Sequence, residues 1–359
     1  MREIYVIIPA LDPKEDFLAY ARETVRTLGA KLVVVDDGSG EESGEIFERI
    51  SGDGTGIVLR HSHNRGKGRA LKTGFAYVRE HGSREALILC ADCDGQHAVK
   101  DLLRVAETVG QHPDCLVLGA RDFKEAGIPF RSRFGNRCTS TVFWLLCGKW
   151  FPDTQTGLRG FHFRLLGELT EIPGERFEYE MRMLLTVVRK GIPVRNVPVD
   201  TIYEGENEGS HFRPFWDSLR ILGVLFAGIW QFALSSVGCA ILDVVLFHFF
   251  LKWIPDRSAL PVLSLFGRIT WATGAARILS AGANYVLNRE YVFPGKRRKG
   301  SMVRYALLCV GIALASAVSV TTVVRLFPMA PSAAKILCDG VLFFISYKLQ
   351  KDWVFAEKE

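Results

Sequence analysis

The sequence carries little net charge for its length. Its 359 residues have a formal net charge of +6, spread along the chain. So small and dispersed a charge does not predict nucleic-acid binding. The first residues, Met1–Pro9, also lack a basic region followed by a long apolar stretch, so we expect no signal peptide.

Cysteine pairs of the kind that bind zinc are scarce as well. The chain has eight scattered cysteines. Cys90 and Cys93 form one CxxC, but no second CxxC follows to complete a zinc site. We therefore expect these cysteines to fill a protein core, in keeping with a reducing cytosol.

Long apolar runs are missing from the first part of the chain and dominate the second. Up to about residue 212 charged and apolar stretches alternate, and beyond it apolar runs prevail. We predict a cytosolic domain over residues 1–212, an interfacial juxtamembrane helix over 213–231 and a membrane domain over 232–359.

Strand and helix patterns alternate in the first part. β-branched runs bounded by turn residues predict strands, and amphipathic stretches at 13–28 and 68–80 predict helices. This alternation is typical of an α/β fold with a mostly parallel sheet, in which ligands bind beyond the carboxyl ends of the strands. The predicted strands are 4–8, 31–35, 57–59 and 86–90.

The second part holds four runs that approach the length needed to cross a bilayer. Six lysine and arginine residues fall within 288–304, between the second and third runs, and such loops face the cytosol. Four spans then place the N-terminal domain and the C-terminus on that side, in an integral protein of the cell membrane. The predicted spans are 232–251, 269–287, 305–326 and 333–349.

Charged residues occur within these apolar runs. A charge at the bilayer centre costs roughly 2.5–3.5 kcal/mol on insertion scales, so such groups usually pair or line a polar path. We favour structural pairing, for example of Asp243 with Arg277, over a path for a lipid headgroup. Lys335 and Asp339 are the other two such residues.

Acidic residues follow two of the predicted strands. Asp92 and Asp94 stand one residue apart, and their carboxylates suit Mg²⁺ or Mn²⁺ together with a substrate diphosphate. Asp36 and Asp37 end another strand, where they can bind a base and ribose or form an ordinary Asp-Gly-Ser turn. Residues 64–69 supply glycines and basic side chains before a helix, a weak phosphate-binding signal without the GxxxxGK[ST] spacing.

These pieces occur in a characteristic order: Val-Ile-Ile-Pro-Ala at 6–10, Val-Val-Asp-Asp-Gly-Ser at 34–39, Asn-Arg-Gly-Lys-Gly at 64–68 and Asp-Cys-Asp-Gly-Gln-His at 92–97. The ordered set resembles family-2 inverting glycosyltransferases, in particular the dolichyl-phosphate mannosyltransferase and polyprenyl-phosphate glycosyltransferase group. The resemblance implies a GT-A fold, with Asp92, Asp94 and Gln96 at the metal. The residues expected to bind the nucleotide-sugar are Pro9, Ala10, Asp36, Asp37, Lys67, Asp92 and Gln155.

The same resemblance concerns the acceptor. Gly-Ala-Arg at 119–121 is similar to the family's Gly-Ser-Arg, and it implies that Arg121 and Arg131 hold the lipid phosphate. Residues 153–157 and 177–180 match segments that line the cleft. The chain departs from mannosyltransferases at Ser-His-Phe-Arg, 210–213, where they usually have Ser-Lys, so mannose specificity is not expected.

The membrane half resembles a GtrA-like domain. Phe-Ala-Leu-Ser-Ser-Val-Gly at 232–238 matches its start, and residues 288–293 and 350–355 match the repeated ends of its even-numbered spans. This repetition suggests an internal duplication of helix pairs.

Our hypothesis is a metal-dependent, inverting transfer of a hexose from a UDP- or GDP-sugar to undecaprenyl or dolichyl phosphate. The phosphate is largely dianionic at neutral pH, so no strong general base is needed. One alternative is a flippase of lipid-linked sugars whose soluble domain is a non-catalytic scaffold. Another is a processive polysaccharide synthase, although its Gln-x-x-Arg-Trp motif is absent at 155–160.

Overall fold

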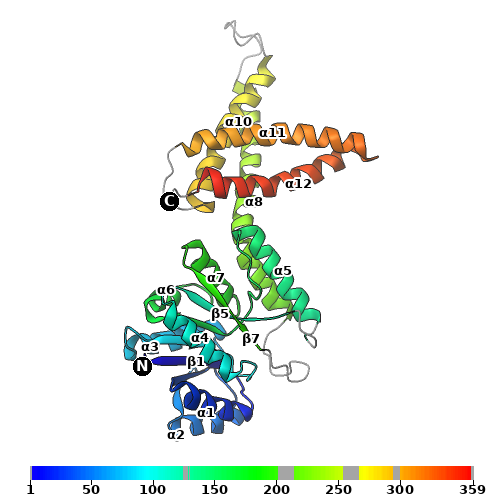
Figure 1. Cartoon of the computed structure of the whole chain (residues 1–359). Coiled ribbons are helices and arrows are strands. Elements are labelled where there is room, and N and C mark those ends of the chain that lie inside the picture. Colours follow the sequence, from blue (N-terminus) through cyan, green and yellow to red (C-terminus); the bar gives the residue numbers. More distant parts are fainter. Residues whose placement is uncertain are drawn as a thin grey trace. The chain divides into compact units, whose positions relative to one another are not determined.

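The computed structural model describes residues 2–123, 128, 130–200, 214–253, 267–293 and 300–356. The chain forms two compact units, Met1–Leu225 and Phe226–Glu359. The boundary between them falls inside helix α8 (Pro214–Trp253), which is continuous (Figure 1). The predicted interfacial helix and first span therefore belong to one helix, and the predicted domain limits stay a prediction.

The first unit is built on a sheet with the strand order β3-β2-β1-β4-β6-β5-β7, parallel except for β6. The prediction of a mostly parallel sheet is confirmed, and the four strands predicted from the sequence correspond to the first four. The strands are β1 (Ile4–Ala10), β2 (Lys31–Asp36), β3 (Gly56–Arg60), β4 (Leu87–Cys90), β5 (Leu116–Arg121), β6 (Arg159–His162) and β7 (Val194–Val199).

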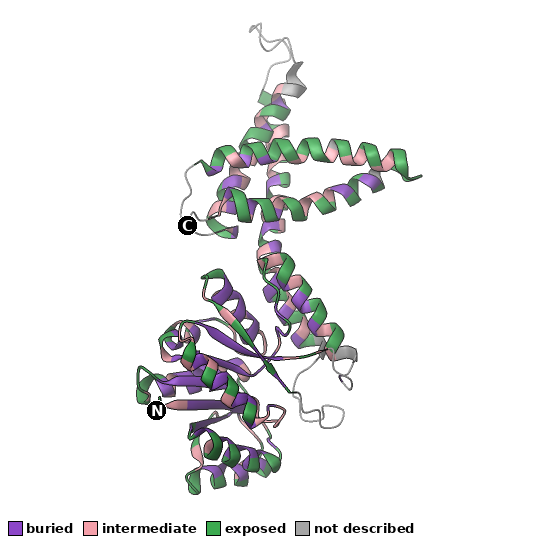
Figure 2. Cartoon of the chain, viewed as in Figure 1, coloured by how far each residue is buried: buried purple, intermediate pink, exposed green. Residues whose placement is uncertain are grey.

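Helices cover both faces of this sheet, which explains the continuous apolar runs in its central strands. Tyr5 and Ile7 of β1 join one core with helices α3, α5, α6, α7 and the start of α8, while Val6 and Ile8 join a second core with α1, α2 and α4. Figure 2 shows this burial along the strands. The helices are α1 (Asp16–Leu28), α2 (Gly44–Gly52), α3 (Lys67–His81), α4 (Val99–Gln111), α5 (Phe130–Cys147), α6 (Leu166–Thr170) and α7 (Glu178–Arg189).

The second unit is helical. It contains the rest of α8, α10 (Gly267–Leu287), α11 (Ser301–Leu326) and α12 (Pro331–Leu349). Among the described residues, two helical segments, Trp216–Trp253 and Ser301–Leu326, are long and apolar enough by composition to cross a membrane. Helices α10 and α12 occupy the other two predicted spans, and their crossing of a membrane stays a prediction.

The suggested duplication has a structural counterpart in reciprocal aromatic contacts. Residues 284–293 and 346–355 correspond at a spacing of 62, so Tyr285 is equivalent to Tyr347 and Phe293 to Phe355. The ring of Tyr285 lies 5.7 Å from that of Phe355, and the ring of Tyr347 lies 5.5 Å from that of Phe293. The tyrosine of each repeat thus contacts the phenylalanine of the other repeat, as in a two-fold symmetric interface.

Polar side chains meet where the two repeats face each other. Buried Asn288 and Gln350 are equivalent in the repeats, and Asn288 Nδ2 donates to Gln350 Oε1 at 3.0 Å. Ser235 Oγ donates to Asn288 Oδ1 at 2.7 Å. Asn288 and Gln350 each begin a π-helical segment, Asn288–Val292 and Gln350–Val354. Single turns of π-helix occur frequently at functional sites.

We predict that Gly160→Ala destabilises the first unit. A Cβ on this β6 residue would lie 2.6 Å from Val105 Cγ1 and 2.7 Å from Val109 Cγ2, so α4 would have to shift. Overpacking of this kind costs about 1–3 kcal/mol. In thermal unfolding of the full chain in detergent, the midpoint temperature for the first unit should be lower than in the wild type. Gly167→Ala in α6, where nothing lies within 4 Å of the added Cβ, is the control and should not lower it.

Candidate active site

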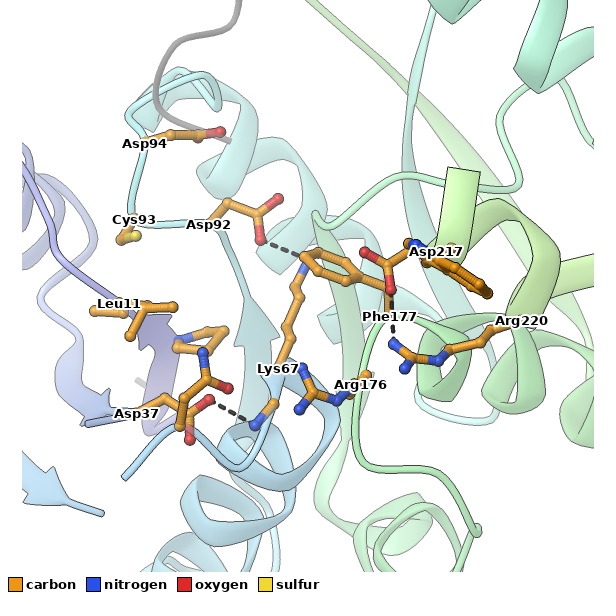
Figure 3. Close-up of a pocket in the computed structure, with 15 residues that line it drawn as sticks. Leu11, Asp37, Lys67, Asp92, Cys93, Asp94, Arg176, Phe177, Asp217 and Arg220 are labelled. Atoms are coloured by element: carbon orange, nitrogen blue, oxygen red, sulfur yellow. Dashed lines mark hydrogen bonds and ion pairs between the residues drawn. The ribbon is translucent and has the colours of Figure 1, made fainter. Parts of the chain in front are cut away.

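A cavity of about 620 Å³ opens in the first unit at the carboxyl ends of β1, β2 and β4 (Figure 3). These three strands are neighbours in the sheet and parallel, so the residues that follow them converge. The cavity is lined by Pro9, Ala10, Leu11, Asp37, Asn64, Gly66, Lys67, Asp92, Cys93, Asp94, Arg176, Phe177, Trp216, Asp217 and Arg220.

Six residues predicted for the site lie in this lining, namely Pro9, Ala10, Asp37, Lys67, Asp92 and Asp94. Four others, Asp36, Gln96, Arg121 and Gln155, are not among the lining residues. Arg131 belongs to α5, but its side chain lies outside the described part of the structure. The functional roles of all these residues stay predictions.

Asp37 organises the loop that precedes α3. Its carboxylate accepts hydrogen bonds from the backbone N–H of Arg65 at 3.0 Å and of Gly66 at 2.7 Å. It also contacts His61 Nδ1 at 2.7 Å. Gly38 has a φ of 81°, and a Cβ there would lie 2.4 Å from the backbone of His63. The Asp-Gly pair therefore packs the 61–66 loop against the end of β2.

Asp36 forms the Asp-Gly-Ser turn that the sequence allowed as an alternative to nucleotide binding. It is buried, and its Oδ1 accepts a hydrogen bond from the backbone N–H of Ser39 at 2.9 Å. Gln155 likewise points elsewhere, because its Nε2 donates to Thr139 Oγ1 of α5 at 3.3 Å.

Asp92 pairs with a lysine. Lys67 Nζ lies 2.7 Å from Asp92 Oδ1 and 3.0 Å from Glu180 Oε2, between two carboxylates. Burial alone would lower the pKa of Lys67, but the two carboxylates raise it, so the amine stays protonated. Burial opposes ionisation of Asp92, and the charges of Lys67 and His97 nevertheless hold its pKa below the ordinary range.

Asp94 faces the same cavity without such a counter-ion in the described residues. Burial, and then the charge of Asp92, raise the pKa of Asp94. A divalent cation bound between the two neighbouring carboxylates would relieve their repulsion. Gln96 contributes through its backbone N–H, which donates to Asp94 Oδ1 at 3.1 Å.

The donor set fits a metal that is shared with substrate. Within the described part of the chain, no group of three or more His, Cys, Asp or Glu side chains is assembled to hold a metal by itself. Two carboxylates together with diphosphate oxygens are ligands that Mg²⁺ and Mn²⁺ accept. Cys93 adds no thiolate, because burial raises its pKa to about 12.

Arg121 is held by an acid. Its Nε lies 2.6 Å from Oδ2 of the fully buried Asp153, and its Nη2 lies 3.3 Å from Oδ1. This pair fixes the end of β5 to the segment that leads to Gly157. At Gly157 a Cβ would lie only 2.1 Å from Asp92 Oδ2, so the Asp92 carboxylate packs directly on this glycine.

The opposite wall holds residues that the sequence analysis did not assign to the site. Arg176 lines the cavity from the loop before α7, and this loop is tied to α3 because Glu175 pairs with Arg69. Trp216 and Arg220 come from the first turns of α8, where Asp217 Oδ1 lies 3.0 Å from Arg220 Nη1. Their signal in the sequence was the unusual mixture of Trp, Asp and Arg ahead of a long apolar run.

Two family models match the chain, one to each part. "Glycosyl transferase family 2" matches residues 5–170, and "GtrA/DPMS, transmembrane domain" matches residues 231–355. An uncharacterized protein of Methanocaldococcus jannaschii is 31% identical over 206 residues, which span 56% of this chain and 82% of that protein. The chain belongs to glycosyl transferase family 2.

Named relatives of this family-2 glycosyltransferase include two enzymes that use dolichyl phosphate. A UDP-N-acetylglucosamine–dolichyl-phosphate N-acetylglucosaminyltransferase of Methanococcus voltae is 27% identical over 219 residues, covering 56% of this chain and 86% of the relative. A dolichyl-phosphate beta-glucosyltransferase of Saccharomyces cerevisiae is 23% identical over 247 residues, covering 60% of this chain and 71% of the relative.

Among solved structures, a mannosyltransferase from Pyrobaculum calidifontis in complex with GDP-Man and Mn²⁺ covers 98% of this chain and 88% of its own. It is 15% identical to this family-2 glycosyltransferase, with a TM-score of 0.39.

We predict that Gly157→Ala impairs divalent-metal binding while the protein stays folded. The added Cβ would displace the Asp92 carboxylate, and metal sites tolerate only small errors in ligand position. Mn²⁺ affinity, followed by electron paramagnetic resonance of free Mn²⁺, should fall about 10-fold or more. Gly135→Ala in α5, where nothing lies within 4 Å of the Cβ, is the control. Equal affinity in both variants would contradict the contact between Gly157 and Asp92.

Proposed function

We propose that this family-2 glycosyltransferase transfers a hexose from a UDP- or GDP-sugar to the phosphate of a polyprenyl lipid, undecaprenyl or dolichyl phosphate. One observation carries the proposal. A single cavity has carboxylates on one wall and arginines on the other, and one of these arginines stands on the helix that continues into the apolar second unit. The activities named for the two dolichyl-phosphate relatives support the same reaction.

The acidic wall suits the donor. Asp37 and the loop it holds lie at the end of β2, where they can receive the nucleoside, and Lys67 begins α3, whose N-terminus favours anionic groups. Asp92 and Asp94 would hold Mg²⁺ or Mn²⁺ beside the diphosphate. A bound divalent cation would offset the negative charge that develops on the departing nucleoside diphosphate.

The basic wall suits the acceptor. Arg220 comes from α8, and its planar guanidinium can bind a phosphate through two parallel hydrogen bonds. Asp217 keeps this guanidinium in place beside the cavity. Arg121 and Arg131 keep their proposed acceptor role, although the ion pair of Arg121 with Asp153 would have to loosen for direct contact.

The acceptor itself supplies the nucleophile. A phosphate monoester has its second pKa near 6, so an oxygen of its dianion can attack the sugar carbon without a general base. Arg220 and Arg176 would orient this phosphate opposite the leaving diphosphate, and orientation is then the main contribution of the protein. Direct displacement inverts the anomeric configuration, so an α-linked donor would give a β-linked product.

We further propose that the catalytic unit and the C-terminus face the cytosol, where nucleotide-sugars are present. The support is the basic segment 288–304, which carries six lysine and arginine residues between two helices of the transmembrane domain. Cytosolic reporters fused at either end of the full chain should both be active, whereas periplasmic or lumenal reporters should be silent. Reporters active on opposite sides would contradict an even number of spans.

The proposed reaction predicts metal-dependent labelling of lipid. Protein purified in detergent would be incubated with radiolabelled UDP- and GDP-sugars, Mn²⁺ or Mg²⁺, and either polyprenyl phosphate. Label should enter the lipid phase only with polyprenyl phosphate, and Asp94→Ala should abolish it. If no donor yields labelled lipid while nucleotide and polyprenyl phosphate still bind, transport or scaffolding becomes the better hypothesis.

We predict that Arg220→Gln raises the KM for polyprenyl phosphate and leaves the KM for the donor unchanged. Hydrogen bonds to charged groups contribute about 1.5–3 kcal/mol, so the KM should rise roughly 10- to 100-fold. Arg220→Lys should recover part of the loss. Arg189→Gln, on the exposed side of α7, is the control. An increase confined to the donor KM would instead place Arg220 in the donor site.

A further inference from the structure

Four charged side chains of alternating sign form a chain into the wall of the cavity: Arg159, Glu180, Lys67 and Asp92. Arg159 Nε lies 4.0 Å from Glu180 Oε1, and its Nη1 donates to the Glu180 backbone carbonyl at 2.6 Å. Lys67 Nζ then bridges Glu180 Oε2 at 3.0 Å and Asp92 Oδ1 at 2.7 Å. The chain thus runs from a buried arginine to the carboxylate that faces the cavity.

Burial decreases steadily along this chain. The side-chain exposure is 1% for Arg159, 9% for Glu180, 14% for Lys67 and 29% for Asp92. Charges in such surroundings are strongly destabilising unless they are paired, so removal of one partner leaves its neighbour uncompensated. The two inner groups form a fixed anchor, and the two outer groups are accessible to a ligand.

Asp92 therefore has two competing uses. Its Oδ1 is occupied by Lys67, and its Oδ2 lies against Gly157 and 3.5 Å from His97 Nε2. A divalent cation that binds Asp92 and Asp94 meets the positive charge of Lys67 on the same carboxylate. Glu180 and then Arg159 lie on one side of Lys67, and the cavity that Lys67 lines is open to its ammonium.

The cavity offers Lys67 a new partner when a diphosphate is present. Lys67 is the first residue of α3, directly after the N–H groups of Arg65 and Gly66 that Asp37 holds. Its four-carbon side chain is flexible and its ammonium is a compact point charge that binds phosphate well. Phe177 lies beside it, with the ring centre 5.8 Å from Nζ.

We infer that Lys67 is a resident counter-ion of Asp92 that passes to the diphosphate of the donor, while Glu180, anchored by Arg159, sets its reach. The inference deepens the proposed function and rests on it only for the identity of the diphosphate ligand. Without nucleotide, Lys67 opposes metal binding at Asp92. With nucleotide, the diphosphate accepts Lys67, so diphosphate and metal strengthen the binding of each other, and this coupling is reciprocal.

The inference is tested by Mn²⁺ binding rather than by turnover. Free Mn²⁺ would be titrated by electron paramagnetic resonance on the full-length protein in detergent, first alone and then with UDP, GDP, uridine or guanosine. We expect weak binding alone and clearly tighter binding with the diphosphate that this protein accepts. The nucleosides, which lack the diphosphate, should have no such effect.

Lys67→Met carries the decisive comparison. Removal of the competing charge should tighten nucleotide-free Mn²⁺ binding about 3- to 10-fold, which corresponds to roughly 0.6–1.4 kcal/mol. The additional tightening by the diphosphate should shrink by a similar factor. Lys67→Arg keeps a cation at the position and should keep nucleotide-free binding weak, which separates lost charge from misfolding.

Lys72→Met is the matched control. Lys72 lies on the same helix, is similarly buried and pairs with Glu175 at 2.8 Å, away from Asp92. Its Mn²⁺ affinities with and without diphosphate should equal those of the wild type. Asp92→Asn should weaken Mn²⁺ binding, since it removes the proposed ligand.

Three outcomes would overturn the inference. Nucleotide-free Mn²⁺ binding that is unchanged or weaker in Lys67→Met would show that Lys67 does not compete for Asp92. A diphosphate effect of full size in that variant would show that Lys67 is not transferred. A wild type in which no diphosphate tightens Mn²⁺ binding would also refute it. Failure of the proposed function differs, because lipid labelling would then be absent while the coupling persists.

Discussion

The ion pair between Lys67 and Asp92 joins the elements on which the cavity depends. Asp92 follows β4 in the centre of the sheet, Lys67 begins α3, and Glu180 on the other side of the lysine belongs to the first turn of α7. Gly157 packs on the same aspartate from the segment before β6. A change in any of these elements therefore alters the position of the Asp92 carboxylate. Because the interacting groups are largely buried, this dependence is stronger than that of a surface ion pair.

Local backbone chemistry places the remaining groups around this pair. Gly66 has a φ of 102°, and a Cβ on it would lie 2.4 Å from the Glu175 carbonyl, so only glycine allows the start of α3 to approach the loop before α7. This close approach puts Arg176 and Phe177 opposite the acidic strand ends. In the proposed reaction, the acids on one wall would hold the metal beside the diphosphate and the arginines on the other would offset the charge of the second phosphate.

Much of the sheet could be predicted from the sequence, because a short β-branched run between turn residues is typical of a buried strand. Convergence of Asp37, Asp92 and Asp94 followed from the rule that parallel strand ends share one edge. Arg176 and Arg220 could not be found this way. Both lie outside the strand ends, and their positions depend on tertiary contacts, namely the tie between Glu175 and Arg69 and the packing of α8 on the core of the first unit.

Arg121 illustrates the opposite limit of sequence reasoning. The resemblance of its motif implied a role in holding the lipid phosphate, and this role stays a prediction. The structure adds an ion pair with a buried aspartate 32 residues later, which the motif did not indicate. A side chain's partner is set by the register of distant segments, which a local motif does not encode. Gln155 likewise has a partner outside its own motif, Thr139, whereas Asp36 forms the local turn that its Asp-Gly-Ser sequence allowed. The nucleotide-binding roles expected for both residues stay predictions.

The transmembrane domain bears on the choice between structural pairing and a headgroup path. Phe-Ala-Leu-Ser-Ser-Val-Gly at 232–238 is similar to Tyr-Ala-Leu-Leu-Cys-Val-Gly at 305–311, a spacing of 73 that makes Asp243 equivalent to Ser316. At the spacing of 62 found for the second helix of each repeat, Arg277 is equivalent to Asp339. Asp243 lies 3.4 Å from Arg277 in one repeat, and Ser316 donates to Asp339 at 2.6 Å in the other. The same two positions thus interact in both repeats although the residues differ in charge. A headgroup site would require a particular charge, whereas helix–helix contact requires only that the polar groups satisfy each other. The duplicated contact therefore supports structural pairing for these four residues, in keeping with the proposal that arginines of the first unit recognise the lipid phosphate.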